Sequence, residues 1–264
     1  MHVTSLHCYP IKGCRGHDLD AADVELLGIR DDRRLMVVDA SDRFISQREV
    51  AALATVEPKR TGLRLELLAG NATFATDIQL DGAPRAVQIW NDRVTAVDQG
   101  DAAAEWFADV IGQRCRLVAF GERSRRAINP YFTPRHDAQT SFTDGFPLLG
   151  VLEESLADLN SRLDAPVPMA RFRPSIVVRG APAWSEDGWR GMTIGVLEVD
   201  GVKPCARCVV TTTDQQTGAR HPEQEPLRTL SSFRVQRPFG TIFGMNIVPR
   251  TAGRIAVGDA VVAL

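Results

Sequence analysis

The chain has 264 residues and a formal net charge of −2 at pH 7, which argues against a nucleic-acid polymer as its partner. Hydrophobic residues make up 44% of it and charged residues 24%, as in ordinary globular proteins, and its length allows one large domain or two smaller ones. The sequence has no run of about 18 apolar residues, so we expect no helix that crosses a membrane.

The first residues, 1–13, form a pattern typical of a β-strand that begins almost at once. Because no basic region followed by an apolar stretch comes first, we expect neither a signal nor a transit peptide, and the cytoplasm is the expected location. The cysteines are Cys8, Cys14, Cys115, Cys205 and Cys208. An odd number in a chain of this length favours reduced thiols over a framework of disulfides.

Short β-like segments alternate with turns over the next hundred residues. The segments cover 34–38, 63–68 and 86–90, and turn signals such as Asp81-Gly82 separate them. This spacing is typical of a barrel or a sandwich. A helix is predicted over 101–112, with Asp101 and Gly112 as its caps, and a strand over 115–120 follows.

The C-terminal half begins with a polar segment over 121–145, which is predicted to be a long loop that either borders a site or only connects two elements. A helix is expected over 153–163 and a shorter one over 225–233. The predicted strands of this half cover 175–179, 193–199, 208–213, 241–248 and 254–264. The expected fold is therefore mainly β with a few helices (α+β), without an internal repeat or a clear linker.

Cys205 and Cys208 are separated by two residues in the stretch KPCARCVVTTTD, residues 203–214. A closed zinc site would need one more ligand than these thiols and His221 offer. A thioredoxin-like redox pair would need a helix after the motif, whereas residues 208–213 are largely β-branched and predict a strand. Packing of two small, half-buried side chains is the remaining structural explanation.

The charges around this motif favour a further interpretation. Lys203 and Arg207 flank the cysteines and favour the thiolate form. A thiolate is a suitable ligand for a soft, high-valent metal whose other ligands come from an anionic cofactor. Because side chains alternate along a strand, Cys205 and Arg207 would face one side and Cys208 the other, so the two cysteines need not share one role.

Several stretches together resemble one known family. KPCARCVVTTTDQQTG is similar to the signature of the molybdenum-cofactor sulfurase C-terminal (MOSC) domain family, and is closest to the branch that contains the mitochondrial amidoxime-reducing component and its bacterial relatives. The other stretches that agree are CYPIKGCRG, GIRDDRRLMVVD, RFISQRE, DGFPLLGVLEESLADLNSRL, RFRPSIVVRG, EPLRTLSSFR and GRIAVGDAVVAL. The resemblance covers residues 3–264.

The resemblance implies an N-terminal MOSC-associated β-barrel domain over residues 1–115 and a β-barrel-like MOSC domain over 116–264. A molybdenum–pyranopterin (molybdopterin) cofactor is implied between them. In this family two dithiolene sulfurs, one protein thiolate and oxo groups hold the metal, and the match places the thiolate on Cys208. The implied activity is the reduction of N-hydroxylated compounds, namely amidoximes, hydroxylamines and N-hydroxylated bases.

A separate flavin reductase or ferredoxin-type protein is the expected electron donor, because no cysteine follows Cys208 to hold an iron–sulfur cluster. We expect small N-hydroxylated substrates, and neither a nucleic-acid polymer nor a membrane, as partners. The alternative is a carrier of sulfur or of molybdenum cofactor that uses Cys208 without reducing a substrate. A binding module without the metal is a third hypothesis.

The resemblance also implies which residues contact the cofactor. They are Lys12, Gly13, Arg33, Arg48, Phe146, Arg173, Ser175, Arg207 and Cys208. Gly13 and Phe146 stand where relatives have serine, so each is expected to contribute only its backbone. Arg34 is the alternative to Arg33 in its block.

Two further expectations concern residues near this set. Pro174 is expected to hold Arg173 in an extended conformation, and Ser175 offers a single hydroxyl where relatives often have asparagine. Asp214 follows the threonine run and is expected either to act as a catalytic residue that relays protons or to begin a turn.

Overall fold

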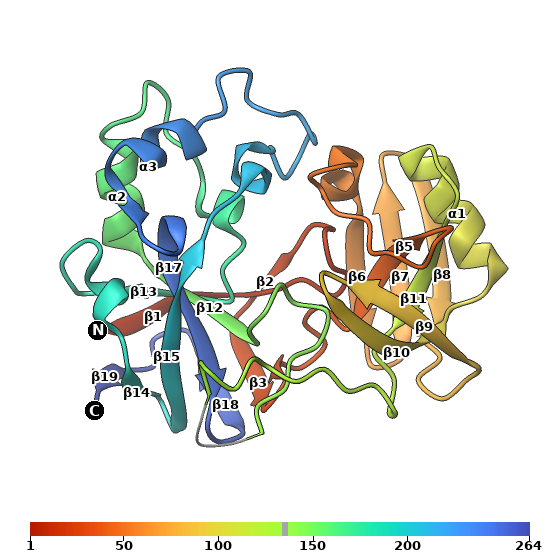
Figure 1. The fold of residues 1–264 in the computed structure, drawn as a ribbon, viewed down its shortest axis with the longest axis horizontal. Helices are drawn as coiled ribbons and strands as arrows, with labels where there is room; N and C mark the ends of the chain where they lie inside the picture. Colours follow the sequence, from red (N-terminus) through yellow and green to blue (C-terminus); the bar gives the residue numbers. More distant parts are fainter. Residues whose placement is uncertain (134–136) are drawn as a thin grey trace.

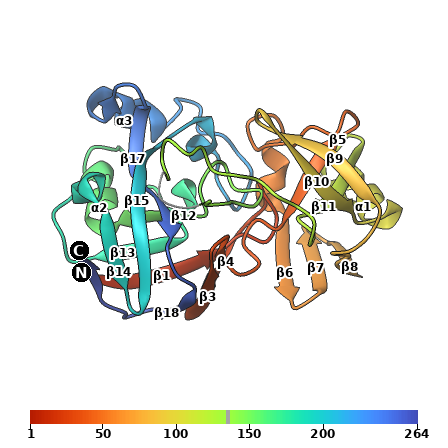
Figure 2. The same ribbon diagram turned by 60° about the horizontal axis from the view of Figure 1, so that its bottom comes forward.

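The computed structural model describes residues 1–133 and 137–264, which form two halves lying side by side (Figure 1, Figure 2). One half contains two sheets from residues 35–119, and the other combines the C-terminal strands with the first thirty residues. The described residues include three α-helices, so the predicted mainly β class is confirmed. In neither half do the pairings between described strands close into a ring.

The half drawn on the right of Figure 1 has a four-stranded and a three-stranded antiparallel sheet. Its elements are β5 (Leu35–Asp39), the 3₁₀ turn η1 (Ala51–Thr55), β6 (Glu57–Thr61), β7 (Arg64–Ala69), β8 (Ala72–Asp77), β9 (Pro84–Ile89), β10 (Asp92–Asp98), α1 (Asp101–Ile111) and β11 (Cys115–Ala119). The strands and the helix predicted here are confirmed to within two residues at each end.

β5 lies between two apolar clusters, which explains its unbroken run of apolar residues. Leu35 and Val37 pack in one cluster with Phe107 of α1. Met36 and Val38 point to the other face and pack in a cluster with Phe142. A strand that is covered on both faces loses the usual alternation of apolar and polar residues. The segment before β12 is thereby attached to the N-terminal half through Phe142.

The other half is built on a nine-stranded sheet in which only β12 and β13 pair in parallel among the described strands. Its strands are β1 (His2–Cys8), β2 (His17–Leu19), β12 (Leu148–Leu152), β13 (Ile176–Arg179), β14 (Gly191–Ile194), β15 (Leu197–Ala206), β16 (Val235–Gln236), β17 (Gly240–Pro249) and β19 (Val261–Ala263). The order is β19-β14-β15-β17-β12-β13-β1-β2, and β16 pairs with β17.

Each face of this sheet is covered by different elements. Leu159 of α2 (Glu153–Asn160) and Leu230 of α3 (Leu227–Phe233) pack against Phe243 on one face. On the opposite face, Val24 and Ile255 belong to the small sheet formed by β18, β3 and β4. The bounds of this sheet are β18 (Gly253–Ala256), β3 (Ala21–Glu25) and β4 (Gly28–Ile29), and the remaining short turns are η2 (Met169–Phe172), η3 (Ser185–Gly188) and η4 (Val209–Thr212).

The first thirty residues pair with strands of the C-terminal half. β1 pairs with β13, and β3 pairs with β18. The domain boundary expected at residue 115 stays a prediction. In the structure, strands from before and after this residue pair in the same sheets. The arrangement brings the loop 9–16 and the segment 30–34 between the two halves.

Two predicted strands contain a turn instead. The segment 193–199 crosses a two-residue turn at Gly195-Val196, where Ile194 pairs directly with Leu197. The segment 254–264 is divided by Gly258 between β18 and β19. Both glycines have positive φ, 55° and 95°, which L-residues rarely adopt. The apolar alternation continues on both sides of each turn, so the sequence pattern did not reveal the interruption.

The predicted strand over 208–213 is wrong, because β15 ends at Ala206 and the 3₁₀ turn η4 follows. The hydroxyl of Thr211 donates to the carbonyl oxygen of Cys208 at 3.0 Å, and that of Thr212 donates to Val209 at 2.8 Å. These local bonds give the backbone an alternative to the sheet and outweigh the β-propensity of the threonine run. The motif is therefore a tight turn after a strand.

The other predictions for this half need smaller adjustments. Residues 121–145 contain no helix or strand in their described part, as predicted; residues 134–136 lie outside the described residues. α2 ends three residues before the predicted end, and α3 begins at Leu227, after a cis bond between Glu225 and Pro226. No helix in the described part of the chain is long and apolar enough to cross a membrane.

Gly28, on β4, is expected to be a glycine at which an added methyl group disturbs packing against the segment before β12. It has φ of 98°, and a Cβ atom there would lie 2.7 Å from the carbonyl oxygen of Pro147. We expect Gly28→Ala to lower the free energy of unfolding by roughly 2–4 kcal/mol in urea denaturation. The matched control is Gly70→Ala, with φ of 57° and open space around it, where we expect a loss of about 1 kcal/mol. Equal losses would contradict this prediction.

Candidate active site

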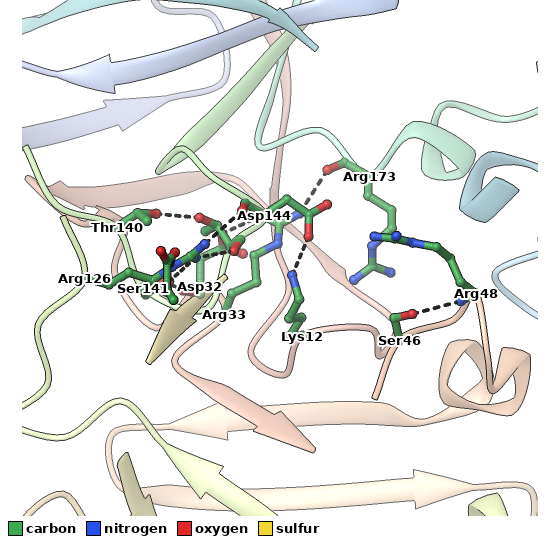
Figure 3. A network of polar contacts seen from close by, with 12 residues as sticks. Lys12, Asp32, Arg33, Ser46, Arg48, Arg126, Thr140, Ser141, Asp144 and Arg173 are labelled. Carbon is green, nitrogen blue, oxygen red and sulfur yellow. Dashed lines mark hydrogen bonds and ion pairs between the residues drawn. The ribbon is translucent and has the colours of Figure 1, made fainter. Parts of the chain in front are cut away.

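A cleft between the two halves gathers most of the site residues expected from the sequence. Its cationic and thiol-bearing side chains are Lys12, Arg33, Arg48, Arg173, Arg207, Cys205 and Cys208. Gly13 and Phe146 line the cleft as well. The contributing segments are the loops after β1, β4 and β5, the end of the long loop before β12, the turn η2 and the turn after β15. Figure 3 shows Lys12, Arg33, Arg48, Asp144 and Arg173 from these segments.

Lys12 and Asp144 form an ion pair across the cleft. The ammonium nitrogen of Lys12 lies 2.5 Å from Oδ1 of Asp144, and it also packs against the rings of Phe44 and Trp90. Burial lowers the pKa of Lys12 more than the carboxylate raises it. Partial desolvation raises the pKa of Asp144, but Lys12 and the nearby arginines lower it further, so this largely exposed carboxylate is ionised at neutral pH.

Arg126 holds the segment that carries Asp144. Its guanidinium donates to the carbonyl oxygens of Ser141, Thr143 and Asp144 at 2.7–3.0 Å, and it forms an ion pair with Asp92. The side chain is 4% exposed. A guanidinium group that donates to several backbone carbonyl oxygens can fix a segment that has no regular secondary structure. The long loop thus borders the cleft at its C-terminal end.

The guanidinium groups of two cleft arginines lie close to the ring of Tyr9. The guanidinium of Arg33 lies 4.3 Å from the ring centroid, and that of Arg173 lies 4.4 Å from it. Burial raises the pKa of Tyr9 to about 12, so the phenol is neutral and its ring can stack with two cations. Arg33 also binds Asp32 at 2.6 Å and the carbonyl oxygen of Arg173 at 3.1 Å.

Arg173 is held in a different backbone conformation from the expected one. Its φ and ψ are 52° and 48°, so it is left-handed rather than extended, and it closes the turn η2 with its N–H bonded to Ala170. The turn, together with the bond from Nη1 to Gln215 at 2.9 Å, fixes the residue more strongly than the preference imposed by Pro174. Burial lowers the pKa of Arg173 to about 10, and no carboxylate in the described structure pairs with it.

Gln47 and Gln215 form a reciprocal amide pair that joins the halves at the cleft, which Gln47 also lines. Nε2 of each donates to Oε1 of the other, at 2.9 and 3.0 Å, and Nε2 of Gln47 also donates to the carbonyl oxygen of Gly13 at 2.6 Å. Both side chains are buried. The pair therefore fixes Gly13 and Arg173, which come from distant parts of the chain, relative to each other.

Removing the Gln215 side chain is expected to weaken the joint between the halves at the cleft. Gln215→Ala leaves the buried amide oxygen of Gln47 and one donor of Arg173 without partners, which costs roughly 1–3 kcal/mol of unfolding free energy. Gln216→Ala, the exposed neighbour, should change it by about 0.5 kcal/mol or less. Urea denaturation of both variants measures this difference. If the two variants lost similar amounts of unfolding free energy, the amide pair would not contribute specifically to stability.

The two cysteines of the motif both line the cleft, so the expectation that they face opposite sides is wrong. The reason is that the strand ends at Ala206, and the alternation ends with it. Nη1 of Arg207 donates to Sγ of Cys205 at 3.0 Å, while Nη2 donates to the carbonyl oxygen of Phe172. Cys208 is half-buried, and its sulfur has no hydrogen-bond partner among the described residues.

Three arginines of the cleft retain nitrogens without a partner. They are Nε of Arg48, Nη2 of Arg173 and Nε of Arg207, all buried and all without an acceptor in the described structure. Arg48 rests its guanidinium over Trp90 at 4.1 Å. Buried donors are nearly always bonded in native proteins, so this concentration of positive charge is suited to an anionic ligand.

Protein side chains alone do not complete a metal site in the cleft. Within residues 1–133 and 137–264, no three His, Cys, Asp or Glu side chains are grouped closely enough to hold a metal ion. The two thiols fall short of the four ligands that a structural zinc site needs. A metal beside these cysteines would need its remaining ligands from a bound group.

Three residues considered from the sequence lie outside the cleft. Ser175 is fully buried, and its hydroxyl accepts the N–H of Leu149 at 3.3 Å within the sheet. Asp214 accepts the N–H groups of Gln216 and Thr217 and pairs with Arg171, so it forms the turn that was the second expectation for it. Arg34 pairs with Glu25 and lines another cavity, whereas its neighbour Arg33 lines the cleft.

The cavity lined by Arg34 is larger than the cleft, at about 820 Å³ against about 140 Å³. None of its described lining residues is a cysteine or a histidine, and Arg34 and Arg60 are each paired with a carboxylate. The cleft differs in having two thiols beside three arginines that each keep a buried nitrogen without an acceptor in the described structure. Chemistry therefore identifies the smaller cleft as the candidate active site.

Sequence reasoning missed Tyr9, Gln47, Asp144 and Gln215. Tyr9 and Gln47 stand inside stretches that were recognised for a neighbouring residue, Lys12 in one and Arg48 in the other. Asp144 is part of a turn-like Thr-Asp-Gly segment that carries no sign of an ion pair with residue 12. A buried glutamine pair formed across 168 positions leaves no local pattern in the sequence.

Comparisons with known proteins agree with this arrangement. Residues 1–114 match the model of the MOSC N-terminal beta barrel domain, and residues 137–262 match that of the MOSC domain. Mitochondrial amidoxime-reducing component 1 of Mus musculus is 33% identical, with 99% of this chain and 82% of that protein covered. Mitochondrial amidoxime reducing component 2 of Bos taurus is 32% identical over 98% of this chain and 82% of that protein.

A more distant relative is the molybdenum cofactor sulfurase of Oryza sativa subsp. japonica, which is 28% identical over 89% of this chain and 31% of that protein. The matches to both domain models, and the near full-length match to the mouse protein, lead to one conclusion. The chain belongs to the MOSC-domain family, in the group that pairs a MOSC N-terminal beta barrel domain with a MOSC domain and includes the mitochondrial amidoxime-reducing components.

Proposed function

We propose that the cleft binds a molybdenum–pyranopterin cofactor and that the protein is an oxidoreductase that reduces N-hydroxylated compounds with electrons from a separate redox protein. The observation that carries this proposal is the set of buried, unpartnered arginine nitrogens beside two cysteines. Relatives named amidoxime-reducing component and molybdenum cofactor sulfurase support the choice of reaction and of cofactor.

The residues present suit such a cofactor. Lys12, Arg33 and Arg173 would hold its negative charge, and Arg48 and Arg207 would add donors from the rim. Gly13 has φ of 85°, and its carbonyl oxygen is fixed by Gln47. Its backbone N–H is the group that the proposal assigns to the ligand. The cleft encloses only about 140 Å³, so side chains at its rim must move apart when a group of this size enters.

The choice between the two cysteines follows from their surroundings. Arg207 already donates to Cys205, whereas the sulfur of Cys208 faces the cleft without a partner. We assign the role of metal ligand to Cys208. The chemistry that such a cofactor supplies when bound is a two-electron reduction that removes oxygen from an N–OH group, and two protons complete the products, an N–H group and water.

The other residues of the chain bind and orient. Asp144 is ionised and faces the cleft, so it can accept a hydrogen bond from an N–H group of a substrate but does not donate a proton. Asp214 is bound in its turn and lies outside the cleft, and we therefore do not assign it the proton relay. Solvent that reaches the exposed Asp144 is the proton source in this proposal.

Elemental analysis with cofactor extraction, on protein from a host that makes the cofactor, tests the first half of the proposal. We expect close to one molybdenum per chain. Turnover of an aryl amidoxime with a chemical reductant tests the second half. Bound molybdenum without turnover would favour the carrier, and protein without molybdenum would favour a binding module. The cytoplasmic location and the type of electron donor stay predictions.

A further inference from the structure

Lys203 places an unpaired positive charge beside the cleft. It lies on β15, two residues before Cys205, and its ammonium nitrogen is 4.9 Å from the ring centroid of Phe132 and 5.6 Å from that of Phe239. Within the described residues it forms no ion pair with a carboxylate. Two ring faces therefore fix the cation without neutralising it.

The neighbours of Lys203 connect it to the cleft on two sides. Phe132 packs edge-on against Phe146, with ring centroids 5.6 Å apart, and Phe146 lines the cleft. Nδ2 of Asn246 donates to the carbonyl oxygen of Lys203 at 3.0 Å, and Asn246 lines the cleft as well. Phe146 and Phe132 thus form an aromatic wall, which begins in the cleft and ends at the ammonium group of Lys203.

Lys203 differs from the other lysines of the chain. Lys12 is buried and paired with Asp144, and Lys59 is exposed on β6, in the other half of the molecule. Lys203 is half-buried, lies against two aromatic rings, and precedes Cys205 by two residues in the chain. A lysine in these surroundings offers three donors to an anion, because an ammonium group has no acceptor of its own.

We propose that Lys203, with Phe132 and Phe146, forms a substrate subsite that favours N-hydroxylated amidines or bases carrying a negatively charged substituent. The flat part of the substrate packs on the aromatic wall, and a carboxylate or phosphate group binds the ammonium of Lys203. This inference rests on the proposed function and narrows its substrate class. An anion at this position gains more than one on the open surface, because the rings limit access of water.

The test compares two aryl amidoximes that differ only by a para-carboxylate, in protein with measured molybdenum content. In Lys203→Gln, we expect the ratio of kcat/KM for the carboxylated over the neutral substrate to fall roughly tenfold, mainly through KM for the carboxylated one. Lys203→Arg should restore most of the ratio. Raising the salt concentration should lower the ratio in the unaltered protein and not in Lys203→Gln.

Lys59→Gln is the matched control, since it removes the same charge far from the cleft and should leave the ratio as it is. Saturation-transfer NMR with benzoate gives a second readout that needs no turnover, and its signal should be lost in Lys203→Gln. If neither substrate is reduced, the proposed function is wrong. The benzoate signal, which needs no turnover, then still tests whether the subsite binds an anion. An unchanged ratio with an unchanged benzoate signal, or loss of molybdenum in Lys203→Gln, would overturn the subsite.

Discussion

Cys208→Ala is expected to abolish reduction of N-hydroxylated substrates, by on the order of a thousandfold or more, while the protein stays folded. The sulfur of Cys208 faces the cleft and has no partner among the described residues, so its removal leaves no buried group unsatisfied. The loss would arise at the metal, whose protein ligand disappears. Steady-state kinetics with a chemical reductant, together with the sulfur-to-metal absorption band, measures it.

Cys205→Ala is the matched control, because it removes the same group from the same cleft. Its sulfur accepts a hydrogen bond from Arg207, which can bond to water instead. We expect most of the activity and the absorption band to remain. If Cys205→Ala were the inactive variant and Cys208→Ala the active one, the ligand would be the first cysteine of the motif, and our assignment would be wrong.

Arg173→Met is expected to lower the cofactor content of the protein without lowering its stability. The guanidinium is buried, its pKa is lowered by burial to about 10, and no carboxylate in the described structure forms an ion pair with it. In protein without cofactor, methionine should therefore leave the unfolding free energy unchanged or raise it by about 1 kcal/mol. Molybdenum content should fall about tenfold or more, because one charged hydrogen-bond donor to the anion is lost.

Arg34→Met is the control for this prediction. Arg34 is also buried, but it pairs with Glu25 and lines the larger cavity. We expect it to lose stability and to keep molybdenum, which is the opposite pattern. Urea denaturation of the cofactor-free variants and elemental analysis of the loaded ones measure the two quantities. If Arg173→Met keeps its molybdenum, Arg173 is a structural residue.

The sequence predicted the elements of the fold better than their arrangement. Segments with clear apolar alternation, such as β7, and the capped helix α1 appear where we expected them, because these signals are local. The hairpin at Gly195-Val196 and the turn η4 were missed, because apolar alternation persisted through the first and hydroxyl groups bonded to the backbone in the second. Pairing of β1 with β13 depends on contacts that no local pattern records.

The sequence predicted most of the charged residues of the site, but not the neighbouring side chains that hold them in place. Arg33 and Arg34 are neighbours in the sequence, and only the left-handed backbone at Arg33, with φ of 48°, shows which of them faces the cleft. Tyr9 and the amide pair hold the arginines by stacking and by bonds between distant residues. Such second-layer contacts arise from packing, and a single sequence does not contain a signal for them.

β1 pairs on one side with β2, which follows it closely in the chain, and on the other side with β13, which is translated much later. His2 pairs with Arg179, so the edge of β1 that faces β13 stays unpaired until well over a hundred further residues have been translated. At usual translation speeds of about 5–20 residues per second, this delay is on the order of ten to thirty seconds. During that time an apolar edge is open to wrong pairing. Chaperone demand in the cell should therefore respond to changes in β1 more than to changes in β7, whose hairpin partner follows within seconds.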